Sequence, residues 1–207
     1  MTSTARVLRP ARFCNPANKN DEGMGDPTAH LNCYKIREPK LQPIDVVVQN
    51  QFGEQNLTVV KADSLCVPAE KDLVPSELNI NHFKCYKVRT TQRTPAFTPR
   101  NVSVADQFED KMASAFTPAL LCNPVDKNGE GMPFPENHLT CFKIKDLPGQ
   151  PTFQPQPIEV TDQFVTEDLN ISRRADCSRV RLLCVQSSKR LASPSGAFLD
   201  VGIGVLD

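Results

Sequence analysis

Three short motifs recur along the chain, and this repetition constrains its fold more than any other feature. The first motif, His-[Leu/Phe]-x-Cys-[Tyr/Phe]-Lys-[Ile/Val], occupies residues 30–36, 82–88 and 138–144. The second, Val-x-[Asn/Asp]-Gln-Phe, follows each time and ends at Phe52, Phe108 and Phe164. A period of about 55 residues indicates three tandem units.

The third motif, [Leu/Phe]-Cys-[Asn/Val]-[Pro/Gln], occurs four times, at Cys14, Cys66, Cys122 and Cys184. The extra copy lies at the start, where residues 5–16 align with 57–68, the last strand expected in the first unit. The chain therefore divides into an N-terminal strand, three repeats and a C-terminal tail. The expected boundaries are 1–12, 13–64, 65–120, 121–190 and 191–207.

Cysteine content and charge narrow the class of protein. Eight cysteines at regular spacing among plentiful Asn and Gln favour disulfide bonds in an extracellular or cell-surface protein. A formal net charge of zero argues against partners such as nucleic acid, which needs clustered Lys and Arg. No apolar run is long enough for a membrane-spanning helix, and residues 1–13 lack the apolar core of a secretory signal.

Two disulfide schemes respect the repeat. The separation is 19 residues from Cys14 to Cys33, and the two later counterparts have the same spacing. Because a closed loop tolerates length changes poorly, this constancy favours the pairs 14–33, 66–85 and 122–141, with Cys177 bonded to Cys184. The alternative pairs 33–66, 85–122 and 141–184 leave Cys14 and Cys177 to bond each other or another chain; sequence alone does not decide connectivity.

The fold class expected is all-β. Short β-branched and aromatic runs, such as 33–36, 44–49, 56–60, 83–88, 158–161 and 178–185, alternate with turns rich in Pro and Asn. A unit of about 55 residues buries little apolar area, so one disulfide per unit fits its need for stability. We expect three small disulfide-linked units, each sandwich-like or barrel-like, with extended N- and C-terminal strands.

The combination His-x-x-Cys-Tyr-Lys, Asp-Gln-Phe and Leu-Cys-Val-Pro-Ala-Glu-Lys (residues 65–71) resembles a family of tandem extracellular β-repeats without an assigned function, known mainly from bacterial secreted proteins. The resemblance covers most of residues 13–190. It implies a secreted, non-catalytic, modular role and transfers no site residues. The third unit departs from the pattern, with Gln186 in place of proline and a longer hairpin that contains Cys177.

Candidate catalytic and metal sites are few. His30, His82 and His138 could form metal half-sites with their cysteines, but residues i and i+3 of a strand face opposite sides, which favours repeated structural hydrogen bonds. Asp126, Asn128 and Glu130 alternate before a glycine as calcium ligands do, and residues 18–23 form a counterpart, but neither loop has the bidentate Glu at position twelve. We expect no cofactor, since a polar turn is favoured over calcium binding at these loops. No catalytic motif occurs, so an enzyme is not expected.

Three Asn-x-Ser/Thr triplets begin at Asn56, Asn101 and Asn170 and are candidate glycosylation sites. Such triplets also arise by chance at this asparagine content. The absence of Trp argues weakly against sugar binding by the protein itself.

The C-terminal tail has a strict period of two. The apolar side chains of Phe198 and of Leu199, Val201, Ile203 and Val205 predict a strand with one apolar face and one nearly bare face. Such a strand must be buried, either along the edge of its own last unit or in the open sheet edge of a neighbouring molecule. We therefore expect a secreted structural protein that polymerises head to tail into a filament or surface assembly, a homopolymer formed by strand exchange. The alternative is a monomeric adhesion or ligand-binding module.

Overall fold

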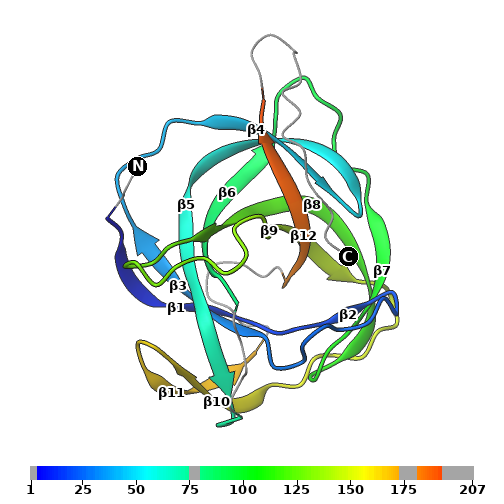
Figure 1. Cartoon of the computed structure of the whole chain (residues 1–207). Coiled ribbons are helices and arrows are strands. Elements are labelled where there is room, and N and C mark those ends of the chain that lie inside the picture. Colours follow the sequence, from blue (N-terminus) through cyan, green and yellow to red (C-terminus); the bar gives the residue numbers. More distant parts are fainter. Residues whose placement is uncertain (1–3, 75–79, 173–180, 193–207) are drawn as a thin grey trace.

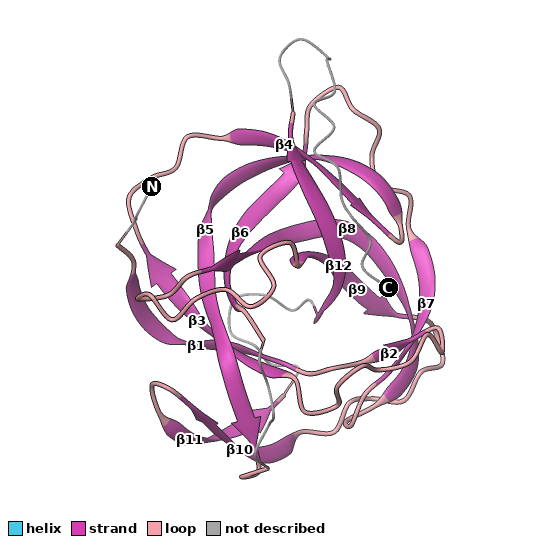
Figure 2. Cartoon of the chain, in the orientation of Figure 1, coloured by secondary structure: helices cyan, strands magenta, loops and turns pink. Residues whose placement is uncertain are grey.

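The structure, a computed structural model, describes residues 4–74, 80–172 and 181–192. Within these ranges every regular element is a β-strand, as Figure 2 shows. The strands are β1 (Arg6–Cys14), β2 (Asn18–Lys19), β3 (His30–Arg37), β4 (Ile44–Asn50), β5 (Gly53–Lys71), β6 (His82–Thr90), β7 (Arg100–Ala105), β8 (Asp110–Val125), β9 (His138–Asp146), β10 (Gln156–Asp162), β11 (Thr166–Ile171) and β12 (Arg181–Leu191).

The sequence motifs mark fixed points in each repeat. The first strands of the three repeats, β3, β6 and β9, each begin at the motif histidine. The second strands are β4, β7 and β10, and the third strands, which carry the second cysteine of each repeat, are β5, β8 and β12. The Asn/Asp-Gln-Phe motif forms the turn after the second strand, where the Asn50, Asp106 and Asp162 side chains each accept a bond from the amide two residues later, at 2.7 to 2.9 Å. These Asx turns start hairpins because the side chain mimics a backbone carbonyl.

Six strands close into a ring of antiparallel pairs (Figure 1). β5 pairs with β6, β6 with β8, β8 with β9 and β9 with β12. β12 then pairs with β4, which returns to β5. The first and third repeats therefore meet directly, and Ser187 of β12 lies opposite both Asn50 and His138.

The third repeat differs from the others in its last strand. In the first two repeats a single long strand, β5 or β8, follows the hairpin turn. In the third, the described residues after the turn are β11, which pairs with β10, and β12, and residues 173–180 between them lie outside the described ranges. The cysteine separation grows accordingly, from 33 and 37 residues in the first two repeats to 43 in the third.

The buried side chains form a cysteine-rich cluster and three satellite clusters. The cysteine-rich cluster includes Leu31, Phe83 and Leu120 around the disulfides. Each satellite lies under one second strand, with Val46, Val102 and Ile158 as representatives. The hairpins thus have cores of their own but share the cluster that holds Cys33, Cys66, Cys85, Cys122 and Cys141.

The all-β class and the three disulfide-linked units are confirmed, and β1 is the N-terminal strand expected. The three units join one continuous sheet, because the third strand of each repeat (β5, β8 or β12) also pairs with a strand of another repeat. The expected boundaries at 64/65 and 120/121 fall inside β5 and β8. The described part of the chain contains no helix with the length and apolar character to cross a membrane.

Candidate functional site at the edge of β1

β1 pairs with β3 as if it were the third strand of another repeat. Cys14 lies opposite Leu31, just as Cys66 lies opposite Phe83 and Cys122 opposite Leu139. Each of these three strand pairs also contains two register shifts, at equivalent places along the strands. The same junction between repeats therefore occurs three times.

The outer edge of β1 has no strand beside it among the described residues. Its equivalents β5 and β8 are paired on both edges: β5 with β3, β4 and β6, and β8 with β6, β7 and β9. β1 pairs with β3 alone. Unpaired N–H and C=O groups on such an edge can accept another strand.

A buried carboxylate holds β1 in place. Asp63 of β5 is 3% exposed in its side chain, and its oxygens accept bonds from Arg12 Nη1 at 2.9 Å and Lys35 Nζ at 2.6 Å. Burial acts to raise the pKa of Asp63, but the bonds from Lys35 and Arg12 outweigh it and hold the pKa below 3.8. Arg12 thereby ties β1 to β5 across the intervening β3.

The disulfide pairs are Cys33–Cys66, Cys85–Cys122 and Cys141–Cys184, each joining the first and third strands of one repeat. The favoured pairs 14–33, 66–85 and 122–141 are therefore wrong, and the alternative scheme is correct for these six cysteines. Bonded cysteines lie directly opposite each other in the register, with Cα atoms 3.9 Å apart. The cysteines that are 19 residues apart in the sequence are instead diagonal neighbours on adjacent strands.

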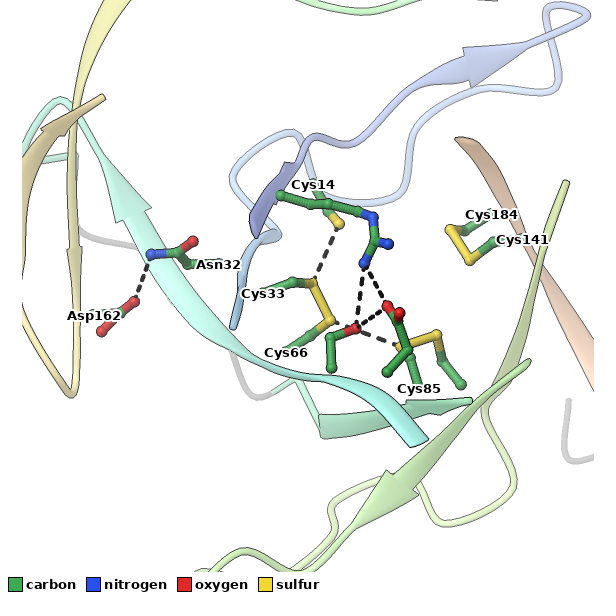
Figure 3. The surroundings of a disulfide bond; sticks show 12 residues. Cys14, Asn32, Cys33, Cys66, Cys85, Cys141, Asp162 and Cys184 are labelled. Atoms are coloured by element: carbon green, nitrogen blue, oxygen red, sulfur yellow. Dashed lines mark hydrogen bonds and ion pairs between the residues drawn. A yellow bond between two sulfur atoms is a disulfide. The ribbon is translucent and has the colours of Figure 1, made fainter. Parts of the chain in front are cut away.

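Cys14 is a free thiol, which corrects its assignment as a disulfide cysteine. It occupies the third-strand position of Cys66, and no first strand lies opposite it among the described residues. Its sulfur is 3.6 Å from Cys33 Sγ, as the dashed line in Figure 3 shows. Burial raises the pKa of the Cys14 thiol, while Arg12 acts to lower it. The expected partner of Cys184, Cys177, lies outside the described residues.

The candidate calcium loops hold lysines close to their carboxylates. Lys127 pairs with Glu130, and Lys19 pairs with Glu22 in the counterpart loop. Asp126 Oδ1 accepts the Gly131 amide at 2.9 Å. The Asn128 backbone has a positive φ of 57°. No group of three metal-ligating side chains occurs in the described ranges, and calcium binding stays a prediction.

These lysines belong to a repeated contact that the motif search missed. Lys19, Lys71 and Lys127 each lie 5.9 Å from the ring centre of a motif phenylalanine, respectively Phe52, Phe108 and Phe164. A cation over an aromatic face is attracted by the ring quadrupole. A sequence pattern could have revealed this contact, because every third-strand cysteine, including Cys184, is followed by a lysine at the spacing Cys-x4-Lys.

The motif histidines do not share the side-chain hydrogen bond that was expected. Within the described part of the chain, His82 is the only motif histidine that forms an ion pair, between its Nε2 and Glu130 Oε2 at 2.9 Å. The Nδ1 atoms of His30, His82 and His138 are all buried without a partner among those residues. Desolvation lowers the pKa of each ring, which favours neutral imidazoles.

Acid should weaken the fold through His138. Desolvation and the nearby Lys189 lower its pKa from 6.5 to about 4, so the unfolded chain binds the extra proton between these values. Stability should fall as pH drops from 6.5 to 4, and this histidine should contribute about 1 to 2 kcal/mol after allowance for its exposure. Urea unfolding of His138→Asn across this range should show a shallower loss than the wild type. Equal slopes would contradict the assignment.

The candidate glycosylation sites differ in exposure. Asn101 on β7 and Asn170 on β11 are exposed, whereas Asn56 on β5 is half-buried. The apolar residues of the predicted tail strand, 198–206, lie outside the described residues.

Comparison with known proteins identifies the repeat. A family model described as "Repeat of unknown function (DUF7450)" matches residues 30–185. The chain belongs to this family. The DUF7450 match begins at the first residue of β3 and ends one residue after Cys184. It therefore spans the three disulfide-linked units and leaves β1 outside. No curated protein and no solved structure matches the chain.

Proposed function

We propose that this DUF7450 protein is a non-catalytic, secreted structural subunit that polymerises head to tail into an extracellular filament or surface assembly. The observation that carries the proposal is the one-sided pairing of β1, since its register equivalents β5 and β8 are paired on both edges. Three disulfide bonds fit a secreted or extracellular protein.

The sequence of β1 is compatible with pairing on both edges. Pro10 lies opposite Tyr34, as Pro118 of β8 lies opposite Phe142. On the edge of β8 away from β9, the partner strand changes from β7 to β6, and Pro118 lies at this change. A proline at this point therefore leaves β8 paired on both edges. Pro10 therefore does not guard the edge in the way that an isolated proline can.

The proposed occupant is the tail segment 198–206 of a neighbouring copy. Its alternating apolar residues supply one face that needs burial, and its bare face suits close approach of another strand. A contact between two different surfaces of identical subunits generates an open fibre whenever the rotation between successive subunits does not close into a ring. A formal net charge of zero permits identical subunits to stack without strong repulsion.

Two variants test the two sides of this contact. Deletion of residues 197–207 should leave folded, disulfide-bonded monomers, measured by light scattering and negative-stain microscopy. Leu8→Lys, at a residue of β1 that is 46% exposed, should also reduce assembly because a charged edge resists strand addition. Fibres that persist after both changes would refute strand exchange.

Met112→Lys is the matched control. Met112 is 40% exposed, but it pairs with β7 and its backbone also bonds to Gln150 and Leu147. This variant should assemble as the wild type does. Wild-type protein that stays monomeric at all concentrations would instead favour the monomeric adhesion or ligand-binding module.

A further inference from the structure

Five cysteines form a row in which disulfide bonds and close sulfur contacts alternate, and the strand register extends this row to the third disulfide. Cys14 Sγ lies 3.6 Å from Cys33 Sγ, which is bonded to Cys66. Cys66 Sγ lies 3.8 Å from Cys85 Sγ, which is bonded to Cys122. Figure 3 shows the sulfur atoms of Cys14, Cys33, Cys66 and Cys85 following one another in this order.

The strand register continues the row to the third disulfide. Cys122 lies two residues beyond Leu120, which is opposite Cys141. Cys66 stands in the same relation to Cys85, through Ser64. These are diagonal neighbours on adjacent antiparallel strands. Cys122 and Cys141 also pack in the same cluster as the preceding sulfurs, with Cys14 against it.

We propose that this row is a thiol–disulfide exchange ladder, along which the free thiol of Cys14 is relocated to Cys184. The Cys14 thiolate attacks Cys33 Sγ, forms the 14–33 bond and releases the Cys66 thiolate. Cys66 then attacks Cys85 and releases Cys122. Cys122 in turn attacks Cys141 and releases Cys184, which takes up the proton that Cys14 lost.

The exchange conserves three disulfides and one thiol, so it needs no oxidant or reductant. The starting pairs 33–66, 85–122 and 141–184 each lie within one repeat. The product pairs 14–33, 66–85 and 122–141 each join a third strand to the first strand that follows it. Both sets link neighbouring strands of the same sheet, so the strand order is unchanged.

Relocation changes where the protein is reactive. The thiol begins on β1, the strand with the open edge, and ends on β12, the strand that closes the ring through β4. The covalent links change at the same time from within repeats to between repeats. Burial, which raises the pKa of Cys14, keeps most of the thiol protonated at neutral pH and makes the first step slow.

The experiment maps the free thiol over time in the full chain carrying Cys177→Ser, which leaves a single thiol in the starting pairing. Folded protein is incubated at pH 8.5, quenched in acid, alkylated under denaturing conditions and digested for mass spectrometry. Alkylation should begin at Cys14 and shift toward Cys184, with 14–33, 66–85 and 122–141 peptides appearing. The rate should not depend on protein concentration.

The pattern of alkylation distinguishes the ladder from random scrambling. Exchange along the row frees only the third-strand cysteines, Cys14, Cys66, Cys122 and Cys184, and never Cys33, Cys85 or Cys141. Cys14→Ser in the same background should retain the three starting pairs throughout. Alkylation confined to Cys14, alkylation spread over all seven cysteines, or a rate proportional to concentration would each overturn the proposal.

Discussion

Replacing Cys85 and Cys122 together by alanine should lower the free energy of unfolding by about 4 kcal/mol in the chain-entropy treatment of a 37-residue separation. Without the bond, the unfolded chain regains the conformations that this closed loop denies it. The bond also joins two neighbouring strands of the ring, β6 and β8, which pair on their other edges with β5 and β9. Urea unfolding followed by far-ultraviolet circular dichroism suits a chain without tryptophan.

The matched control is Cys14→Ala. Cys14 packs against the same cluster but forms no disulfide, so its loss removes a small, partly buried group and no cross-link. Its effect should be at most about 1 kcal/mol. If the double variant and this control lose equal stability, the 85–122 bond contributes packing alone and the cross-link argument fails.

The repeat pattern predicted strands well because it records positions that backbone geometry fixes. The motif histidine marks the first residue of β3, β6 and β9, and the Asx residue of the second motif starts each hairpin turn. Residues 5–16, aligned with 57–68, contain the strand β1, and β1 pairs with β3 in the register in which β5 pairs with β6. Local signals of this kind suffice to place elements along a chain.

The disulfide pairing could not be decided by spacing, because Cys33 has two cysteines within reach. Cys66 lies directly opposite on one side, and Cys14 lies diagonally on the other at 3.6 Å. The constant separation of 19 measures the connection from each third strand to the next first strand. The bonded pairs instead enclose the second-strand hairpin, whose length varies between repeats.

Closure of the ring was also hidden from the sequence. β12 pairs with β4, where Arg190 lies opposite Val47, and Arg190 Nη2 also donates to Glu54 Oε2 of β5 at 2.7 Å, between residues 136 positions apart. No motif marks that pairing, since it depends on the accumulated twist of the intervening strands. The continuous sheet therefore emerged only from the three-dimensional arrangement.

The repeat motifs do not predict the role of Asp63, because Ala11 and Ala119 occupy its equivalent positions in β1 and β8. It is a buried charge that occurs in one repeat only. Its partners come from three strands: Arg12 from β1, Lys35 from β3 and, at 3.9 Å, Lys87 from β6. A residue with this many partners anchors β1 to the ring.

Replacing Asp63 by alanine should therefore lower the free energy of unfolding by about 3 kcal/mol, at the lower end of the range for breaking a buried ion pair because the cations left behind are partly exposed. Hydrogen exchange should rise more in β1 than in β9. Lys87→Ala, which removes a half-exposed and more distant partner, should cost at most about 0.5 kcal/mol.

The pH dependence gives an independent test of the same carboxylate. The folded pKa of Asp63 lies below 3.8, so the unfolded chain takes up the proton first on acidification. The contribution of Asp63 is fully present above the unfolded pKa and is lost as pH falls through the folded pKa. In Asp63→Asn, which keeps the side-chain volume, the loss of stability below pH 4 should be shallower than in the wild type. A parallel loss in both proteins would show that the three cations do not hold this carboxylate ionised, and that β1 owes its position to the strand pairing with β3.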